Sequence, residues 1–414
     1  MVPVRIENRA QLIYLLTEAA ELEHEILCCY LFATFSMKDD TSEGISAEQL
    51  DLVRDWRRAL GEIVVQEMIH LSTACNLLTA VGGAPQLRRP NLPTSPRAYP
   101  PGFELRLAPF SVDAVDQFVM LERPEALART EDYRASAVSL DSLGDIFSSE
   151  RNFQTVGELY RGIEDGITYL SQKLGEAELF VGPPAAQTAE QFFSLPGLIP
   201  VHDLKSALAA INVIVEQGEG ASADVEDSHY RRFLRMREEF GEALKADPSF
   251  LPGRPVLTNP YAMTPTDVAD VAAVNMVDDP TAVDLCNVFD GCYELMVQVL
   301  GRLFVHAEEA DSQLTVLADI AVSLMIEVIQ PLGNAITELP AGPSHPGLRA
   351  GPSFRLSRGA TVPAHAEAAR RVFYERLTEL ARYCRFLQMR PDAPRILDST
   401  REALDRYALA LIPA

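Results

Sequence analysis

Acidic residues and histidines occupy helix-core positions in the first part of the chain. Glu23 lies in a segment whose apolar residues recur every three or four positions, and Glu67 and His70 lie in a second such segment. This spacing puts all three side chains on the apolar face of a helix, with Glu67 and His70 one turn apart. A carboxylate that faces a core is unfavourable unless it is neutralised, hydrogen-bonded or bound to a metal ion. These residues therefore predict a buried metal site.

The Glu-x-x-His spacing is weak evidence by itself, because the chain contains it three times, at residues 21–24, 67–70 and 226–229. Only the second copy falls squarely on the apolar face of a long helix, where the alternative to a ligand pair is a hydrogen-bonded buried histidine. Di-iron carboxylate bundles combine one Glu from each of two helices with a Glu-x-x-His pair from each of two others. Glu23 and the 67–70 pair together supply half of such a set.

The other half is less regular. Glu216 and Glu219 have the right spacing at the end of a later helix, but the second residue is Glu where His is expected. His229, from the following segment, is a candidate for the missing imidazole, with an interfacial structural histidine as the alternative. Sites rich in carboxylates favour iron or manganese, whereas structural zinc sites favour thiolates and imidazoles. We expect about two iron ions per chain, with manganese as the alternative ion.

The helix expected at residues 155–174 offers no clear ligand. Glu164 lies at the edge of its apolar stripe, whereas Glu158 falls on the other side. A solvent-facing role is the alternative for each. On the first helix, His24 and Tyr30 either support the site or pack structurally.

The elements that must position these residues are helices. Apolar periodicity predicts them over about residues 9–35, 47–81, 112–121, 155–174, 203–216, 229–244, 281–306, 313–339, 364–388 and 394–411. Sustained strand alternation is absent from the sequence. The predicted fold class is all-α, with a four-helix bundle in residues 1–247, a proline-rich linker at 248–261 and a second helical bundle in residues 262–414.

Composition narrows the functional classes. The formal net charge of −23 opposes binding to nucleic acid or to an anionic membrane, because both need clustered Lys and Arg. Charges interrupt the apolar stretches too often to predict a membrane span, and the start of the chain lacks a signal-peptide pattern. The six cysteines form no CxxC pair, so reduced core cysteines in a cytoplasmic protein are expected.

Several segments resemble a single family. They are AELEHEILCCYLFA (20–33), QEMIHLSTACNLLTAVGGAP (66–85), LAPFSVDAVDQFVMLERP (107–124), TVGELYRGI (155–163), SALAAINVIVEQGEG (206–220) and SHYRRF (228–233). The family is the ferritin-like domain associated with iminophenyl-pyruvate dimer synthases, the enzymes of violacein-type bisindole biosynthesis. The resemblance covers about residues 8–245, and the later helices look similar to the region that follows in such proteins.

This resemblance implies a ferritin-like bundle followed by a second helical bundle. The metal ligands that it implies are Glu23, Glu67, His70, Glu216 and His229. It favours Glu158 over Glu164 for the remaining helix, and it makes Glu219 either a ligand or a group that orients one.

The leading hypothesis is a non-haem di-iron oxidoreductase of secondary metabolism, which uses dioxygen or peroxide to oxidise a small, amino-acid-derived substrate. The alternatives are an iron-binding protein with ferroxidase or sequestration activity and a non-catalytic scaffold with a relic site. The expected partners are a small-molecule substrate and, in a homodimer, a second copy of the chain, but not nucleic acid or membrane. Residues 262–414 contain no Glu-x-x-His pair and are expected to be metal-free, either as a structural bundle or as a wall of the substrate cleft.

Overall fold

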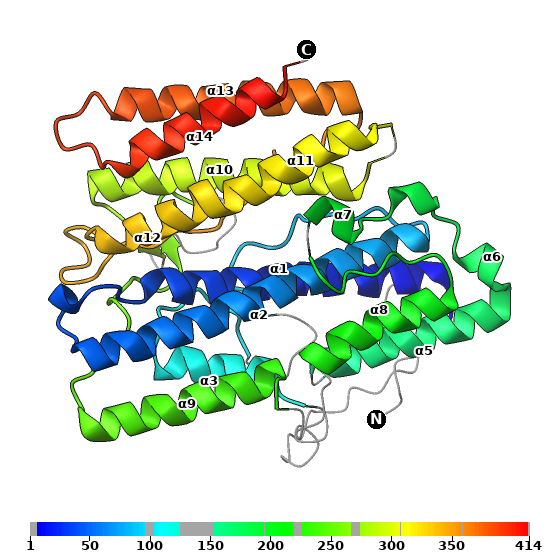
Figure 1. Ribbon diagram of the computed structural model, residues 1–414, viewed down its shortest axis with the longest axis horizontal. Coiled ribbons are helices and arrows are strands. Elements are labelled where there is room, and N and C mark those ends of the chain that lie inside the picture. The colour runs from blue at the N-terminus through cyan, green and yellow to red at the C-terminus, as the bar shows by residue number, and fades with distance from the viewer. Residues whose placement is uncertain are drawn as a thin grey trace.

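The computed structural model describes residues 6–95, 103–124, 153, 155–193, 195–218, 226–265, 274–306, 308–357 and 359–412. Nearly all regular structure in these ranges is helical (Figure 1). The strands of the described residues form one short parallel pair, β1 (Pro260–Tyr261) with β2 (Asn275–Met276). The predicted all-α fold class is confirmed.

Two long helices form the central layer of the molecule: α1 (Arg9–Ser36) and α2 (Ala47–Ala80), joined through the short turn η1 (Thr41–Glu43). Asn8 caps α1 by accepting the backbone N–H of Gln11. Ser46 forms a capping box at the start of α2, so the orphan N–H groups of both helices are partly satisfied.

Two helices on one face of this layer complete a four-helix bundle with α1 and α2. The helix α5 (Val156–Leu174) packs on α1, α8 (Leu204–Gln217) packs on α2, and the two contact each other. The short elements α6 (Glu176–Leu179), η2 (Pro184–Ala186) and α7 (Glu190–Phe193) connect them. The predicted four-helix bundle is therefore confirmed.

A second pair of helices covers the rest of the same face. The helices α3 (Val112–Leu121) and α9 (His229–Ala246) pack together beside the α5–α8 pair, and α9 also contacts α2 (Figure 1). Two helix pairs placed end to end, α5–α8 and α3–α9, thus cover this face of the central layer.

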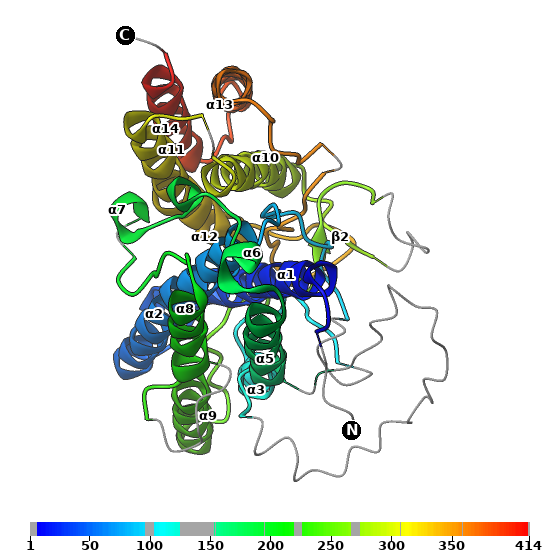
Figure 2. The same cartoon turned by 90° about the vertical axis from the view of Figure 1, so that its right-hand side faces the viewer.

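The later helices cover the opposite face (Figure 2). They are α10 (Pro280–Phe304), α11 (Asp311–Ser323), the π-helical turn η4 (Leu324–Ile329), α12 (Gln330–Glu338), α13 (Ala366–Leu387) and α14 (Ile396–Ala410). The segments α11, η4 and α12 form one continuous helix. Its residue Gly333 admits the Phe35 ring of α1 so closely that an added Cβ would lie 2.3 Å from it.

The continuous helix from Asp311 to Glu338 is long and apolar enough to cross a bilayer, judged by length and composition only. This differs from the expectation drawn from the sequence, because Asp319 and Glu327 are the only charged residues between its two ends. A core helix of a globular protein meets the same criteria, and this one packs against α10, α7, α14 and α1.

Arg254, in the segment between α9 and α10, ties the two helical regions together. Its guanidinium donates to Glu43 at 2.7 Å, to Asp39 at 3.0 Å and to Thr337 Oγ1 at 3.2 Å. Its backbone N–H donates to Ser36 O at 2.7 Å, and the residue is only 5% exposed. One buried cation therefore joins the end of α1, η1 and α12.

Replacing Arg254 with Ala should lower the free energy of unfolding by about 2–3 kcal/mol, because the change removes several charge-assisted hydrogen bonds at once. Urea unfolding of the full chain measures this. Arg54→Ala is the control, since Arg54 forms an exposed pair with Asp51 on α2 and such pairs contribute little. Equal unfolding midpoints for the two variants would contradict the anchoring role.

Candidate metal centre

The ends of the short helices meet beside the middle of α1 and α2. Glu122 caps the C-terminus of α3, α8 ends at Gln217, and His229 is the first residue of α9. Tyr160 comes from the start of α5. This junction brings polar side chains from six helices into one buried region.

Two groups of potential ligands form there, and they share a residue. Glu23, Glu67 and His70 make one group; Glu67, Glu122 and His229 make the other, with ligand atoms in each group within 4.8 Å of one another. Glu67 Oε2 lies 3.2 Å from His70 Nδ1, and Glu67 Oε1 lies 3.0 Å from His229 Nδ1. The two oxygens of one carboxylate therefore face two different imidazoles.

In both imidazoles, the ring nitrogen that points away from the carboxylates is hydrogen-bonded to a glutamine. His70 Nε2 lies 3.3 Å from Gln217 Oε1, and His229 Nε2 lies 2.9 Å from Gln66 Oε1. A glutamine oxygen only accepts, so each Nε2–H donates, and each Nδ1 is the ring nitrogen that faces the carboxylates. Metal-bound histidines typically have their second ring nitrogen held in this way.

Tyrosines hold the two outer carboxylates. Tyr160 donates to Glu23 Oε1 at 2.6 Å, and Tyr30 donates to Glu122 Oε1 at 2.5 Å. In each case the second oxygen, Oε2, makes no hydrogen bond with the described residues. Glu67 Oε1 and His229 Nδ1 lie 3.0 Å apart, but without hydrogen-bond geometry. Buried polar atoms without partners are rare and unfavourable. A cation between these atoms would satisfy all four of them, so the residues fit a metal site.

Electrostatics lead to the same conclusion. All five side chains of the two groups are fully buried. Burial, together with the neighbouring Glu67 carboxylate, raises the pKa of Glu23 well above its usual value. Burial opposes ionisation of Glu67 as well, but His229 and His70 hold its pKa below its usual value. Keeping all three adjacent carboxylates ionised in a region without solvent requires positive charge.

Without a metal ion, His229 supplies part of that charge. Burial favours its neutral form, but Glu122 and Glu67 outweigh burial and raise the pKa of His229 to about 9. An imidazolium there balances at most one of the three carboxylates.

The backbone leaves room for an ion at Gly218. A Cβ at this position would lie 3.2 Å from His229 Nδ1, 3.3 Å from His70 Cε1 and 3.4 Å from Glu122 Oε2. Glycine thus keeps the space between the two imidazoles and Glu122 free of side-chain atoms.

Four of the ligands expected from the sequence, Glu23, Glu67, His70 and His229, come together in the structure. The other candidates lie outside both ligand groups of the described residues. Glu216 is exposed on α8, Glu158 is half-buried in the first turn of α5, and Glu164 is half-buried further along. Glu219 lies outside the described residues.

Glu122 was missed from the sequence, although a signal for it was present. It follows Val115 by seven residues and Phe118 by four, so it continues the apolar stripe of the short helix. The sequence predicts a further carboxylate from the helix at 155–174, whereas the structure places one at the end of α3.

Fold and site together define a helical bundle with a buried carboxylate–histidine centre. The chain belongs to the Ferritin-like family, whose model matches residues 16–238. The family resemblance expected from the sequence is confirmed.

Two curated relatives are larger proteins. The chain is 30% identical over 369 residues to 2-imino-3-(indol-3-yl)propanoate dimerase of Chromobacterium violaceum, covering 84% of this chain and 34% of that protein. It is 27% identical over 422 residues to dichlorochromopyrrolate synthase of Lentzea aerocolonigenes, covering 94% of this chain and 40% of the relative. The chain therefore spans well under half of the length of each relative.

A solved structure supports the fold. The crystal structure of a ferritin-like protein from Caulobacter vibrioides superposes with a TM-score of 0.54 at 17% identity, covering 85% of this chain and all of that one.

The stability of metal-free protein should fall between pH 7 and about pH 9.5. Because the folded pKa of His229, about 9, lies above the ordinary 6.5, its contribution is fully present below pH 6.5 and is lost as pH rises through 9. Urea midpoints of chelator-treated protein measure this decline.

His229→Gln should show a flatter profile over the same pH window. His202→Gln, at an exposed position before α8, serves as the control and should keep the wild-type decline. Parallel profiles for all three proteins would contradict a buried imidazolium at His229.

Proposed function

We propose that this chain is a non-haem di-iron oxidoreductase that acts on a small, amino-acid-derived molecule with dioxygen or peroxide. The observation that carries the proposal is Glu67, whose two oxygens face separate imidazoles while a further carboxylate stands on each side. A carboxylate placed in this way can bridge two metal ions.

The residues divide into two sets around that bridge. Glu23 and His70 would hold one ion, Glu122 and His229 would hold the other, and Glu67 would bind both. Carboxylate-rich donors of this kind suit iron, with manganese as the alternative. Iron bound there would supply two adjacent redox-active ions for chemistry with dioxygen or peroxide.

The surrounding residues prepare the donors. Tyr160 and Tyr30 each occupy one oxygen of an outer carboxylate, which leaves the other oxygen directed into the cluster. Gln217 and Gln66 accept from Nε2–H of the two imidazoles, which leaves Nδ1 as the ring nitrogen that faces the carboxylates. These contacts fix the orientation of the ligands before an ion binds, which lowers the cost of ordering them.

An aromatic wall shields the cluster from water. The Tyr30 ring lies 4.7 Å from the Phe118 ring and 5.2 Å from the Phe233 ring, centroid to centroid, and the two phenylalanine rings are 5.3 Å apart. Excluding water lowers the local dielectric constant and strengthens the attraction between carboxylates and a cation.

The names of the relatives support the class of substrate. One is called a dimerase of 2-imino-3-(indol-3-yl)propanoate, which is an imino acid, and the other a synthase of dichlorochromopyrrolate. We extend to this chain only the general class, a small amino-acid-derived molecule of secondary metabolism.

Elemental analysis of protein expressed with added iron should find about two irons per chain. Glu67→Ala should lose both, because Glu67 belongs to both ligand groups. Glu122→Ala should lose about one, since Glu122 belongs to only one group.

Glu216→Ala is the matched control, because Glu216 is exposed and lies outside both groups. It should retain the wild-type iron content. Two irons in Glu67→Ala would overturn the dinuclear site.

Substrate-dependent uptake of oxygen distinguishes the functional alternatives. Iron-loaded protein should consume oxygen when supplied with aromatic α-amino acids or the imino acids made from them, and Glu67→Ala should not. Oxygen consumption driven by ferrous iron alone would instead indicate a ferroxidase. Absence of both would leave a scaffold and refute the proposed oxidoreductase.

A further inference from the structure

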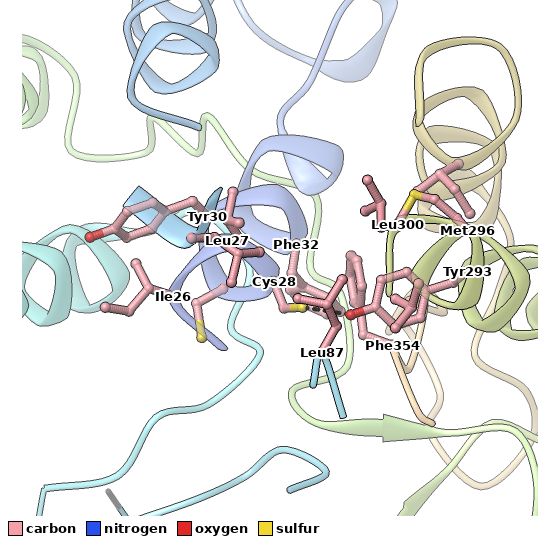
Figure 3. Packing of buried hydrophobic residues seen from close by; sticks show 14 of the residues in the cluster. Ile26, Leu27, Cys28, Tyr30, Phe32, Leu87, Tyr293, Met296, Leu300 and Phe354 are labelled. Carbon is pink, nitrogen blue, oxygen red and sulfur yellow. Dashed lines mark hydrogen bonds between the residues drawn. The ribbon is translucent and has the colours of Figure 1, made fainter. Parts of the chain in front are cut away.

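An apolar cavity of about 360 Å³ lies between α1 and α2 on one side and α10 and η4 on the other. Figure 3 shows part of its wall, with Leu27 of α1 on one side and Tyr293 and Leu300 of α10 on the other. Phe193 of α7 also lines the cavity, although this helix belongs to the connection between α6 and α8. The shape of the cavity therefore depends on how that connection is held in place.

The connecting segment, residues 184–193, contains η2 and α7. Asn76 of α2 holds its middle, because Asn76 Nδ2 donates to Thr188 O at 2.8 Å and Thr188 N–H donates to Asn76 Oδ1 at 2.9 Å. The first part of the segment is held from the other side, where His306 Nε2 lies 2.5 Å from Ala185 O. His306 therefore joins η2 to the region at the end of α10.

Both ring nitrogens of His306 face backbone carbonyls. Nδ1 lies 2.6 Å from Leu303 O, and Nε2 faces Ala185 O. A carbonyl oxygen only accepts, and a neutral imidazole has a single N–H, so both hydrogen bonds form only when the ring is a protonated imidazolium. In the neutral ring, one nitrogen lone pair would face a carbonyl oxygen at the same short distance.

The position at the end of α10 favours a positive charge. The carbonyls of the last helical turn, including Leu303 O, lie at the negative end of the helix dipole. His306 is only 5% exposed, so water screens this attraction little. The backbone around the ring therefore stabilises the protonated form.

The charged side chains of the neighbouring elements are occupied or exposed. Arg302 of α10 forms a buried ion pair with Glu309, so these two charges offset each other. Glu190 of α7 and Glu308 of the following loop are exposed, and η2 carries no titratable side chain. Within the described part of the chain, the hydrogen-bond partners of the His306 ring are the two carbonyls alone.

The ring of His306 also packs beside the part of the segment that lines the cavity. Its centroid lies 6.4 Å from that of the Phe192 ring, and the Phe193 ring lies 6.0 Å from the Phe304 ring. Phe193 and Phe304 both line the cavity. A change in the His306 contact is therefore passed to the cavity wall through neighbouring residues.

We propose that His306 is a pH-sensitive tie: its protonated ring fastens the connecting segment to the end of α10, and loss of the proton removes one of the two hydrogen bonds and loosens the cavity wall at Phe193. Histidine is the side chain whose charge ordinarily changes between about pH 5 and 8. Both bonds form in the acid part of this range, and one is lost as the pH rises through it. The inference goes beyond the proposed function and involves no metal.

Hydrogen exchange of the full chain, followed by mass spectrometry between about pH 5.5 and 8, tests this tie. After correction for the intrinsic exchange rate, protection of the connecting segment should fall about 3–10-fold as the pH rises, because one buried hydrogen bond changes a local opening equilibrium by about that factor. The protection of α13 in the same samples corrects for any change in global stability.

His306→Gln should remove the pH dependence, because a glutamine amide donates hydrogen bonds but does not titrate. His365→Gln is the matched control: it makes the same substitution at an exposed position before α13 and should keep the wild-type profile. Unfolding midpoints show whether each variant retains the fold.

Nitrogen NMR of histidine-labelled wild type supplies a test that does not depend on the stability of a variant. At about pH 5.5 the spectrum should contain one imidazole with both N–H protons protected from exchange with water. Absence of such an imidazole would overturn the proposal. So would constant protection of the connecting segment in the wild type, or the same pH dependence in His306→Gln. Iron content does not enter these measurements, so the result is separate from that of the metal proposal.

Discussion

The buried negative charge around Glu67 is the constraint on which the rest of the N-terminal region depends. Three carboxylates and two imidazoles occupy a region from which solvent is excluded, and four of their polar atoms have no hydrogen-bond partner among the described residues. Such a cluster would be strongly destabilising without compensating positive charge. The surrounding residues orient the cluster: tyrosines donate to the outer carboxylates, glutamine oxygens accept from the imidazoles, and helix ends converge on the centre.

The interruption between α8 and α9 follows from this requirement. One uninterrupted helix along α2 would present a single row of side chains, whereas two helix ends bring Gln217 and His229 to the same point from different directions. Gly218 then lets the backbone approach the imidazoles closely. Local propensity alone would treat this glycine as a helix stop, but the structure also uses it to leave space.

The sequence predicted the long elements well because their apolar periodicity extends over many turns. For the same reason Glu23, Glu67 and His70 could be identified, since each interrupts an otherwise apolar stripe. Glu122 was harder, because a ten-residue helix carries little periodic signal and its cap is ambiguous. The direction in which Glu216 points depends on how α8 packs against α2 and α5, and a single sequence does not contain that information. The later helices were a candidate wall of a substrate cleft, but the residues that line the cavity beside Tyr293 could not be named, since they include pairs more than 200 positions apart.

The central layer also constrains how the molecule can change. Consecutive residues of α1 face different sites: Glu23 belongs to the metal centre, and His24 lines the apolar cavity between α1, α2, α10 and η4. The same is true of Glu67 and Met68 on α2. A rotation of α1 about its own axis would move both side chains together. It would displace the Glu23 carboxylate in the metal centre and the His24 imidazole at the cavity. The helix α1 therefore forms part of the wall of both sites, so a substitution that shifts the helix at one site changes the other as well. Among related chains, changes in the residues of the metal centre should therefore accompany changes in the residues that line the cavity.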